Sequence, residues 1–244
     1  MKILAVIPAR FKSSRFPGKP LVDLLGKSMI QRVYERVVDS DLFDEVIVAT
    51  DDQRIFNHVK IFGKVLMTSE NHDTGTDRCA EVANFFPEME YVVNIQGDEP
   101  LVDALQLQTL INELTKENVQ IATLCNPNVS QQDLENPNRI KVVLNFRNEA
   151  LYFSRSAIPN THHSDLSVKA PFFRHIGLYG FQRNTLLDLV KLQPSIIERI
   201  ESLEQLRWLY YGFKIQVGFS SIETPNIDTP DDVGKVLEIL KGLN

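Results

Sequence analysis

Residues 3–21 have the sequence ILAVIPARFKSSRFPGKPL. Residues 3–7 are continuously apolar and rich in β-branched side chains, which is typical of a buried strand in a parallel sheet. The residues that follow carry four cations and no acidic side chain: Arg10, Lys12, Arg15 and Lys19. Ligands of open α/β sheets bind outside the carboxyl ends of the strands, so this basic loop is placed to bind an anion.

Strand and helix patterns alternate through the first half of the chain. Short apolar runs predict three further buried strands, at 46–49, 65–67 and 91–95. Helical spacing of apolar side chains predicts helices at 29–38, 54–62, 77–86 and 104–114. The alternation predicts a Rossmann-like, doubly wound and mostly parallel α/β sheet.

The pattern changes in the second half. Strand-like runs follow with few helices between them, at 121–124, 140–144, 151–153 and 176–181. Later segments predict two helices, a strand and a final helix, at 186–189, 203–210, 215–217 and from Thr229 to about residue 240. We expect one domain over 1–244, with a main part at about 1–118 and 202–244 and a smaller antiparallel lobe at about 119–201.

Composition and charge exclude several classes of protein. The net charge is −6 and the cations gather in one short loop, so a nucleic-acid partner is not expected. Cys79 and Cys125 form no C-x-x-C pair, which favours a reducing compartment. No apolar run approaches the ~20 residues of a membrane span, and the apolar start is too short for a signal peptide. We expect a cytoplasmic protein without a membrane partner.

The basic loop, residues 8–20, has features suited to a triphosphate. Its three prolines restrict the backbone, which reduces the entropy lost when an anion orders the loop. Arginine side chains offer forked donors to phosphate oxygens, and Lys19 offers a compact charge. Backbone N–H groups around Ser13 and Ser14 add neutral donors. A solvated surface loop is the alternative interpretation.

Two acidic residues stand where a metal ion could bind. Asp98 follows the predicted strand 91–95, and Asp228 precedes the final helix. Mg²⁺ prefers oxygen ligands and is usually held by one or two carboxylates plus substrate phosphates. From the residues alone, a turn role for Asp98 and a helix-flanking role for Asp228 stay open.

Nine short segments agree with one family in order and spacing: Ile7-Pro-Ala-Arg10, Arg15-Phe-Pro-Gly-Lys-Pro-Leu21, Ala49-Thr-Asp51, Gly75-Thr-Asp-Arg78, Asn94-Ile-Gln-Gly-Asp-Glu-Pro100, Leu151-Tyr-Phe-Ser-Arg155, Arg174-His-Ile-Gly-Leu-Tyr-Gly180, Leu203-Glu-Gln-Leu-Arg207 and Asp228-Thr-Pro230. Together they resemble the sugar nucleotidyltransferases of the 3-deoxy-manno-octulosonate (Kdo) cytidylyltransferase, or CMP-Kdo synthetase, family. The resemblance covers nearly the whole chain.

The resemblance implies an activity, a cofactor and a set of partners. The activity is transfer from CTP to Kdo, an acidic eight-carbon sugar, giving CMP-Kdo and pyrophosphate for lipopolysaccharide biosynthesis. The cofactor is Mg²⁺, held by Asp98 and Asp228. The main part of the chain would bind the nucleotide, and the antiparallel lobe would bind the sugar and form a homodimer.

The resemblance also implies the roles of individual residues. The catalytic residues would be Arg10, Arg15, Lys19 and Asp98. The nucleotide would contact Pro8, Ala9, Arg10, Ser13, Lys19, Arg78 and Asp98. The sugar would contact Gln96, Arg155, His175, Tyr179, Glu204 and Gln205.

Two departures from the family pattern occur, and two other functions stay open. Ser28 stands where the family typically has proline, and Phe181 stands where it has an aromatic hydroxyl. Because Phe181 removes a possible polar contact, CTP-dependent activation of the 8-amino analogue of Kdo or of another acidic sugar is an alternative. A non-catalytic nucleotide-binding or dimerising module is a second alternative, although such a module would be expected to lack Lys19 or a metal carboxylate.

Overall fold

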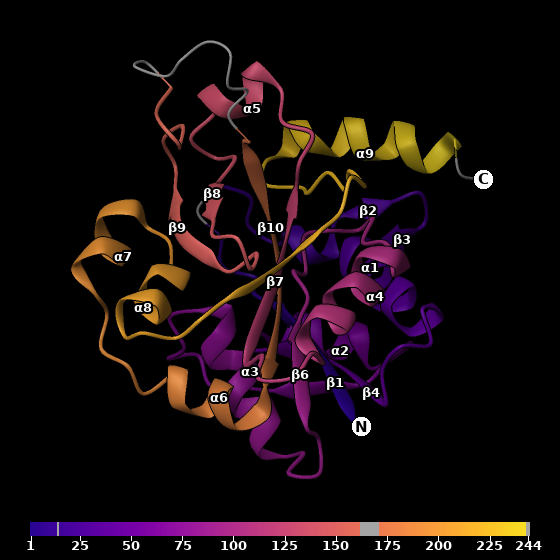
Figure 1. Cartoon of the computed structure of the whole chain (residues 1–244). Helices are drawn as coiled ribbons and strands as arrows, with labels where there is room; N and C mark the ends of the chain where they lie inside the picture. The colour runs from indigo at the N-terminus through magenta and orange to yellow at the C-terminus, as the bar shows by residue number, and fades with distance from the viewer. Residues whose placement is uncertain (14, 162–170, 243–244) are drawn as a thin grey trace. The chain divides into compact units, whose positions relative to one another are not determined.

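The computed structural model describes residues 1–13, 15–161 and 171–242 (Figure 1). Contacts between Cα atoms group the chain into two compact units. The first unit is Met1–Gln108 with Glu223–Asn244, and the second is Thr109–Ile222. The nucleotide- and sugar-binding parts expected from the sequence stay predictions.

The first unit contains a parallel sheet. Its strands are β1 (Ile3–Ala9), β4 (Glu45–Thr50), β5 (Val65–Met67) and β6 (Tyr91–Asn94). β1 lies between β4 and β6, and β5 pairs with the far side of β4, all in parallel. β1 is buried along nearly its whole length, which is why its sequence is continuously apolar.

A helix follows each of these strands as the sequence predicts. The helices are α1 (Met29–Asp39), α2 (Gln53–Val59), α3 (Gly75–Asn84) and α4 (Ala104–Leu114), which contains the boundary at residue 108. A 3-10 turn, η1 (Lys19–Leu21), and the two-residue strands β2 (Asp23–Leu24) and β3 (Lys27–Ser28) were not predicted. Ser28 has a local function, because its hydroxyl accepts from Gln31 N–H at the start of α1 and contacts His58 Nε2 at 2.8 Å.

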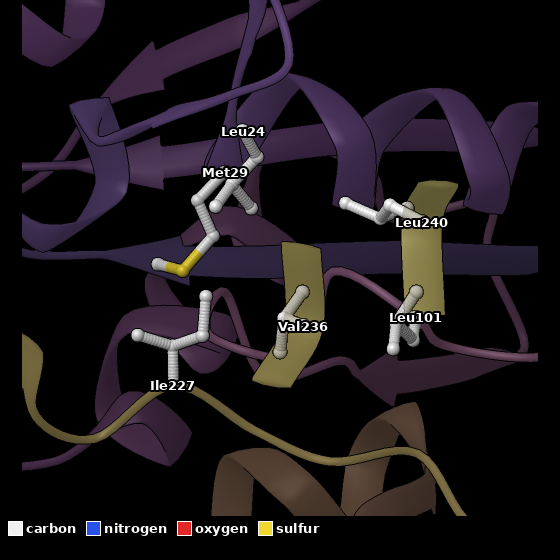
Figure 2. Close-up of a cluster of buried hydrophobic side chains, with 6 residues drawn as sticks. All are labelled: Leu24, Met29, Leu101, Ile227, Val236 and Leu240. Carbon is white, nitrogen blue, oxygen red and sulfur yellow. The ribbon is translucent and has the colours of Figure 1, made fainter. Parts of the chain in front are cut away.

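The C-terminal helix α9 (Pro230–Gly242) packs against the rest of the first unit through an apolar cluster. Figure 2 shows its buried members: Leu24, Met29, Leu101, Ile227, Val236 and Leu240. Val236 and Leu240 lie one turn apart on α9, and Leu101 follows the turn that carries Asp98. The cluster therefore fixes the C-terminal segment next to the Asp98 turn.

The second unit contains mostly antiparallel strands: β7 (Ile121–Asn126), β8 (Lys141–Leu144), β9 (Ala150–Ser154), β10 (Phe173–Gln182) and β11 (Gln216–Phe219). β10 pairs antiparallel with β7 and β8, β8 pairs antiparallel with β9, and β11 pairs parallel with β7. The predicted fold class, a mostly parallel α/β sheet with a smaller antiparallel part, is confirmed.

The described part of the second unit also contains four short helices: α5 (Gln131–Glu135), α6 (Arg183–Leu189), α7 (Ile196–Glu201) and α8 (Gln205–Tyr210). The sequence predicted α6 and α8 but neither α5 nor α7. None of the helices in the described part of the chain has the length and apolar character needed to cross a membrane.

Candidate functional site

A cavity of about 240 Å³ opens in the first unit at the carboxyl end of β1. Seven of the residues predicted to bind nucleotide, sugar or metal line it: Pro8, Ala9, Arg10, Ser13, Lys19, Gln96 and Asp98. The other lining residues are Lys12, Pro20, Met29, Gly75 and Gly97. The basic loop therefore forms the wall of a cavity at the position expected for a ligand of a parallel sheet.

The basic loop is folded back on Phe11. The Phe11 carbonyl accepts a hydrogen bond from Gly18 N–H at 2.9 Å, and Gly18 has a φ of +74°. A Cβ at Gly18 would lie 3.1 Å from the Phe11 ring, so both the backbone conformation and the close approach favour glycine. The Arg54 guanidinium lies 3.3 Å from the centre of the Phe11 ring. Ser14 lies outside the described residues, so the donors expected there are not described.

Two cations of the basic loop face the two carboxylates expected to hold a metal. Lys19 Nζ lies 2.7 Å from Asp98 Oδ2 and 3.7 Å from Asp228 Oδ1. Arg15 Nη2 lies 3.3 Å from the same Asp228 oxygen. The structure thus brings together four predicted site residues from three distant parts of the sequence, and their charges balance.

Backbone contacts hold the two carboxylates in place. Ile227 N–H donates to the Asp98 carbonyl at 2.9 Å, which joins the segments that carry the two acids. Asp228 N–H donates to Asp232 Oδ2 at 3.1 Å. Burial would raise the pKa of Asp232, but hydrogen bonds from Thr229 and Asp228 lower it, so the carboxylate stays ionised. The contact by which Asp232 holds Asp228 was not predicted from the sequence.

Gly97 lies where two backbone segments come so close together that a side chain would not fit. A Cβ at this position would lie 2.6 Å from the carbonyl oxygen of Pro8. Backbone atoms cannot yield as a flexible side chain can, so only glycine allows the Asp98 turn to lie this close to the end of β1.

Arg78, a predicted nucleotide contact, is buried away from the described lining of the cavity. Its guanidinium donates to Asp51 Oδ2 at 2.8 Å and contacts Thr68 Oγ1. These partners follow β4 and β5, so Arg78 ties the ends of two parallel strands together. A contact between Arg78 and the base stays a prediction.

The remaining predicted sugar contacts lie in the second unit. Arg155 lines a separate cavity there of about 690 Å³. Its guanidinium donates to the backbone carbonyls of Glu201, Pro137 and Ser202 at 2.7, 3.1 and 3.2 Å. Its backbone N–H donates to Glu201 Oε2 at 2.9 Å. Three of the five guanidinium N–H donors are therefore committed within the protein.

His175 is held as a neutral ring. Its Nε2 lies 3.0 Å from Thr123 Oγ1, whose hydroxyl donates to the Leu178 carbonyl at 2.8 Å. Because a carbonyl oxygen only accepts, the Thr123 hydroxyl accepts from Nε2–H, and Nδ1 of His175 is left as an acceptor. Burial, with the nearby charge of Arg174, lowers the pKa of His175 to about 3.

Tyr179 lies in an aromatic cluster beside His175. Its ring lies 6.0 Å from that of Phe181 and 5.1 Å from that of Trp208. Burial and the charge of Glu204 raise its pKa well above the ordinary value, so its hydroxyl stays protonated. Gln205 is buried with 6% of its surface exposed, and Glu204 is part-exposed.

Comparison with known proteins adds to this geometry. The family model described as Cytidylyltransferase matches residues 4–215. The chain belongs to the cytidylyltransferase family.

Individual cytidylyltransferases resemble the chain over its whole length. A 3-deoxy-manno-octulosonate cytidylyltransferase of Parabacteroides distasonis is 51% identical over 98% of each chain. The protein of the same name from Bacteroides thetaiotaomicron is 48% identical over 99% of each chain. A solved structure described as CMP:2-keto-3-deoxy-manno-octonic acid synthetase complexed with CTP superposes with a TM-score of 0.94, at 40% identity and full coverage of both chains.

A solved structure with little sequence similarity shares the fold. The 4-diphosphocytidyl-2C-methyl-D-erythritol synthase of Anaerococcus prevotii has a TM-score of 0.67 at 14% identity, over 98% of each chain. The likeness shows that the fold extends beyond enzymes with similar sequences.

Proposed function

We propose that this protein transfers the cytidylyl group of CTP to the anomeric hydroxyl of Kdo, giving CMP-Kdo and pyrophosphate. The observation that carries the proposal is the cluster of Lys19, Asp98, Asp228 and Arg15 beside the cavity at the end of β1. The full-length similarity to enzymes named for this reaction supports the choice of substrates.

The reaction joins the anomeric oxygen of the sugar to the α-phosphorus of CTP, and the proton of that hydroxyl group is released to solvent. The bond between the α-phosphorus and the bridging oxygen breaks, and pyrophosphate leaves with its electron pair. Such a transfer needs positioning and charge stabilisation more than covalent chemistry from the protein. Arg10, Arg15 and Lys19 would hold the phosphates and offset the charge that grows on the leaving group.

The carboxylate pair fits a magnesium ion. Both carboxylates approach the same nitrogen of Lys19, so a small cation between them would have oxygen ligands from two directions. In the described part of the chain no group of three or more His, Cys, Asp or Glu side chains gathers to hold a metal, so the remaining ligands would be phosphate oxygens and water. Bound there, Mg²⁺ would polarise the α-phosphate. Lys19 would then leave the carboxylates and pair with the nucleotide.

The second unit would supply the contacts to the sugar. We propose that His175 contacts hydroxyl groups of Kdo, because a ring with a pKa of about 3 is neutral near pH 7 and cannot pair with the sugar carboxylate by charge. The protonated hydroxyl of Tyr179 offers a donor, and Glu204 offers acceptors. The positive charge for the sugar carboxylate would come from Arg155.

Pyrophosphate release tests the proposal. The protein is incubated with CTP and Mg²⁺ and with Kdo, the 8-amino analogue of Kdo or no sugar. We expect release with Kdo and a loss of about 10²–10³ in turnover for Asp98→Asn. Preference for the 8-amino analogue would favour the alternative substrate, whereas CTP binding without turnover on either sugar would favour a non-catalytic module.

Three further properties belong to the same proposal. The protein would act in the cytoplasm, where its product would serve lipopolysaccharide biosynthesis. It would form a homodimer through the second unit. Sedimentation equilibrium at micromolar concentration would detect the dimer, and a monomer there would contradict it.

A further inference from the structure

One carboxylate of α3 ties down the loop that precedes the helix. Glu81 Oε2 accepts a hydrogen bond from Ser69 N–H at 2.9 Å and contacts His72 Nε2. Burial would raise the pKa of Glu81, but the bonds from Ser69 and His72 outweigh it and lower the pKa. An ionised carboxylate therefore fixes residues 69–72 at two points.

The same loop is fixed at its other end. Thr74 accepts a hydrogen bond from Asp77 N–H at 3.1 Å, and Asp77 Oδ2 accepts from Thr74 N–H at 3.0 Å, which completes a capping box at the start of α3. Glu81 holds Ser69 and His72, and Asp77 holds Thr74, so the loop backbone from Ser69 to Thr74 has little conformational freedom.

The loop in turn holds Arg10. The His72 carbonyl accepts a hydrogen bond from Arg10 Nη2. Arg10 lines the cavity at the end of β1. A guanidinium has five N–H donors, so one bond to a carbonyl sets its direction and leaves the others for a ligand.

We propose that Glu81 and His72 are positioning residues, which orient Arg10 toward the phosphates of CTP. The proposal rests on the proposed function, because it takes CTP as the ligand of the cavity. Glu81 holds the Ser69 backbone and the His72 side chain, the His72 carbonyl fixes the guanidinium, and Arg10 loses less conformational freedom when the nucleotide binds. Immobilising one long side chain costs about 0.5–1.5 kcal/mol, which corresponds to about two- to tenfold in affinity.

Glu81→Ala and His72→Ala test the first two steps. For each variant the dissociation constant of CTP is measured by calorimetry, and KM and kcat by pyrophosphate release. We expect the dissociation constant and KM of CTP to rise about two- to tenfold, with kcat and KM for the sugar within about twofold of their original values. Glu81→Gln, which keeps an acceptor for Ser69 N–H, is expected to recover part of the loss.

A double variant shows whether the effect passes through Arg10. In an Arg10→Ala background, Glu81→Ala is expected to change CTP affinity by less than twofold, because the group that it positions is gone. The matched control is Glu45→Ala, which removes a carboxylate of similar exposure from a pair with Lys64 and is expected to leave CTP affinity unchanged.

Two results would overturn the proposal. One is an equal loss of CTP affinity with and without Arg10. The other is a lower melting temperature of Glu81→Ala or His72→Ala with unchanged CTP affinity, which indicates a purely structural contact. If Glu81→Ala does not fold, His72→Ala carries the test, since it removes one of the two attachment points. Absence of turnover in the original protein would refute the proposed function, while the CTP-binding comparison would still decide the role of Glu81.

Discussion

Replacing Lys19 by methionine should make the carboxylate pair a better metal site. In the structure, Lys19 Nζ occupies the space between Asp98 and Asp228, at 2.7 and 3.7 Å from their oxygens. A divalent cation that binds without nucleotide must displace this ammonium group. Methionine keeps the length and the apolar stem of lysine and removes the competing charge.

The geometry gives the size of the effect. The contact with Asp98 is a charge-assisted hydrogen bond, and a hydrogen bond to a charged group contributes about 1.5–3 kcal/mol. The contact with Asp228 is too long for a hydrogen bond and adds only charge attraction, which the partly exposed surroundings weaken. Lys19→Met should therefore raise the affinity for a metal ion alone by about tenfold or more.

Titration with Mn²⁺ in the absence of nucleotide measures this affinity directly, by electron paramagnetic resonance of the free ion or by calorimetry. Lys64→Met is the matched control, because it removes one positive charge of the same unit from a surface pair with Glu45. Unchanged Mn²⁺ affinity of Lys19→Met, or an equal gain in Lys64→Met, would refute the idea that Lys19 competes with the metal. The same variant should bind CTP more weakly, since it has lost a phosphate partner.

Three other predictions follow from burial and close packing. Because the pKa of His175 is lowered to about 3, the unfolded chain takes up the proton first, and the free energy of unfolding should fall as pH drops below 6.5. This group contributes at most about 1.4 kcal/mol of unfolding free energy per pH unit. In denaturation experiments between pH 6.5 and 5, the unfolding free energy of His175→Gln should depend less on pH than that of the original protein. Val236→Ala removes two methyl groups from the cluster under α9 and should lower the free energy of unfolding, measured with denaturant, by about 2 kcal/mol. It should also weaken Mn²⁺ binding, because Asp228 is then less firmly held. Gly97→Ala forces a Cβ against the Pro8 carbonyl and should cost about 1–3 kcal/mol in stability and raise the KM for CTP; unchanged values would show that the backbone can relax.

The sequence predicted the parallel sheet well because burial on both faces leaves a continuous apolar run, as in β1. It missed α5 because five residues give no helical period. It also missed α7, a helix of six residues that ends at Ser202 in a left-handed conformation, with a φ of +52°, where a glycine would have been the usual signal.

The candidate site could be placed from the sequence, but its internal contacts could not. The end of β1 marked the position of the cavity, since parallel sheets bind ligands there. The pairing of Lys19 with Asp98 and Asp228 depends on how α9 packs, and no local pattern encodes it. Nothing in the sequence indicated that the Arg78 guanidinium is buried against Asp51, because charge alone does not tell which partner an arginine has; its contact with the nucleotide stays a prediction.

The charge balance of the basic loop bears on how its ligands bind. Like charges so close in sequence repel one another, and the structure offsets this by giving Arg15 and Lys19 carboxylate partners and Arg10 a carbonyl. A metal ion alone would take the carboxylates and leave the cations facing a new positive charge. CTP alone would take the cations and leave two neighbouring carboxylates without compensation. When both arrive, every charge keeps a partner of opposite sign, so the metal and the nucleotide should each strengthen the binding of the other, and Lys19→Met should weaken that coupling.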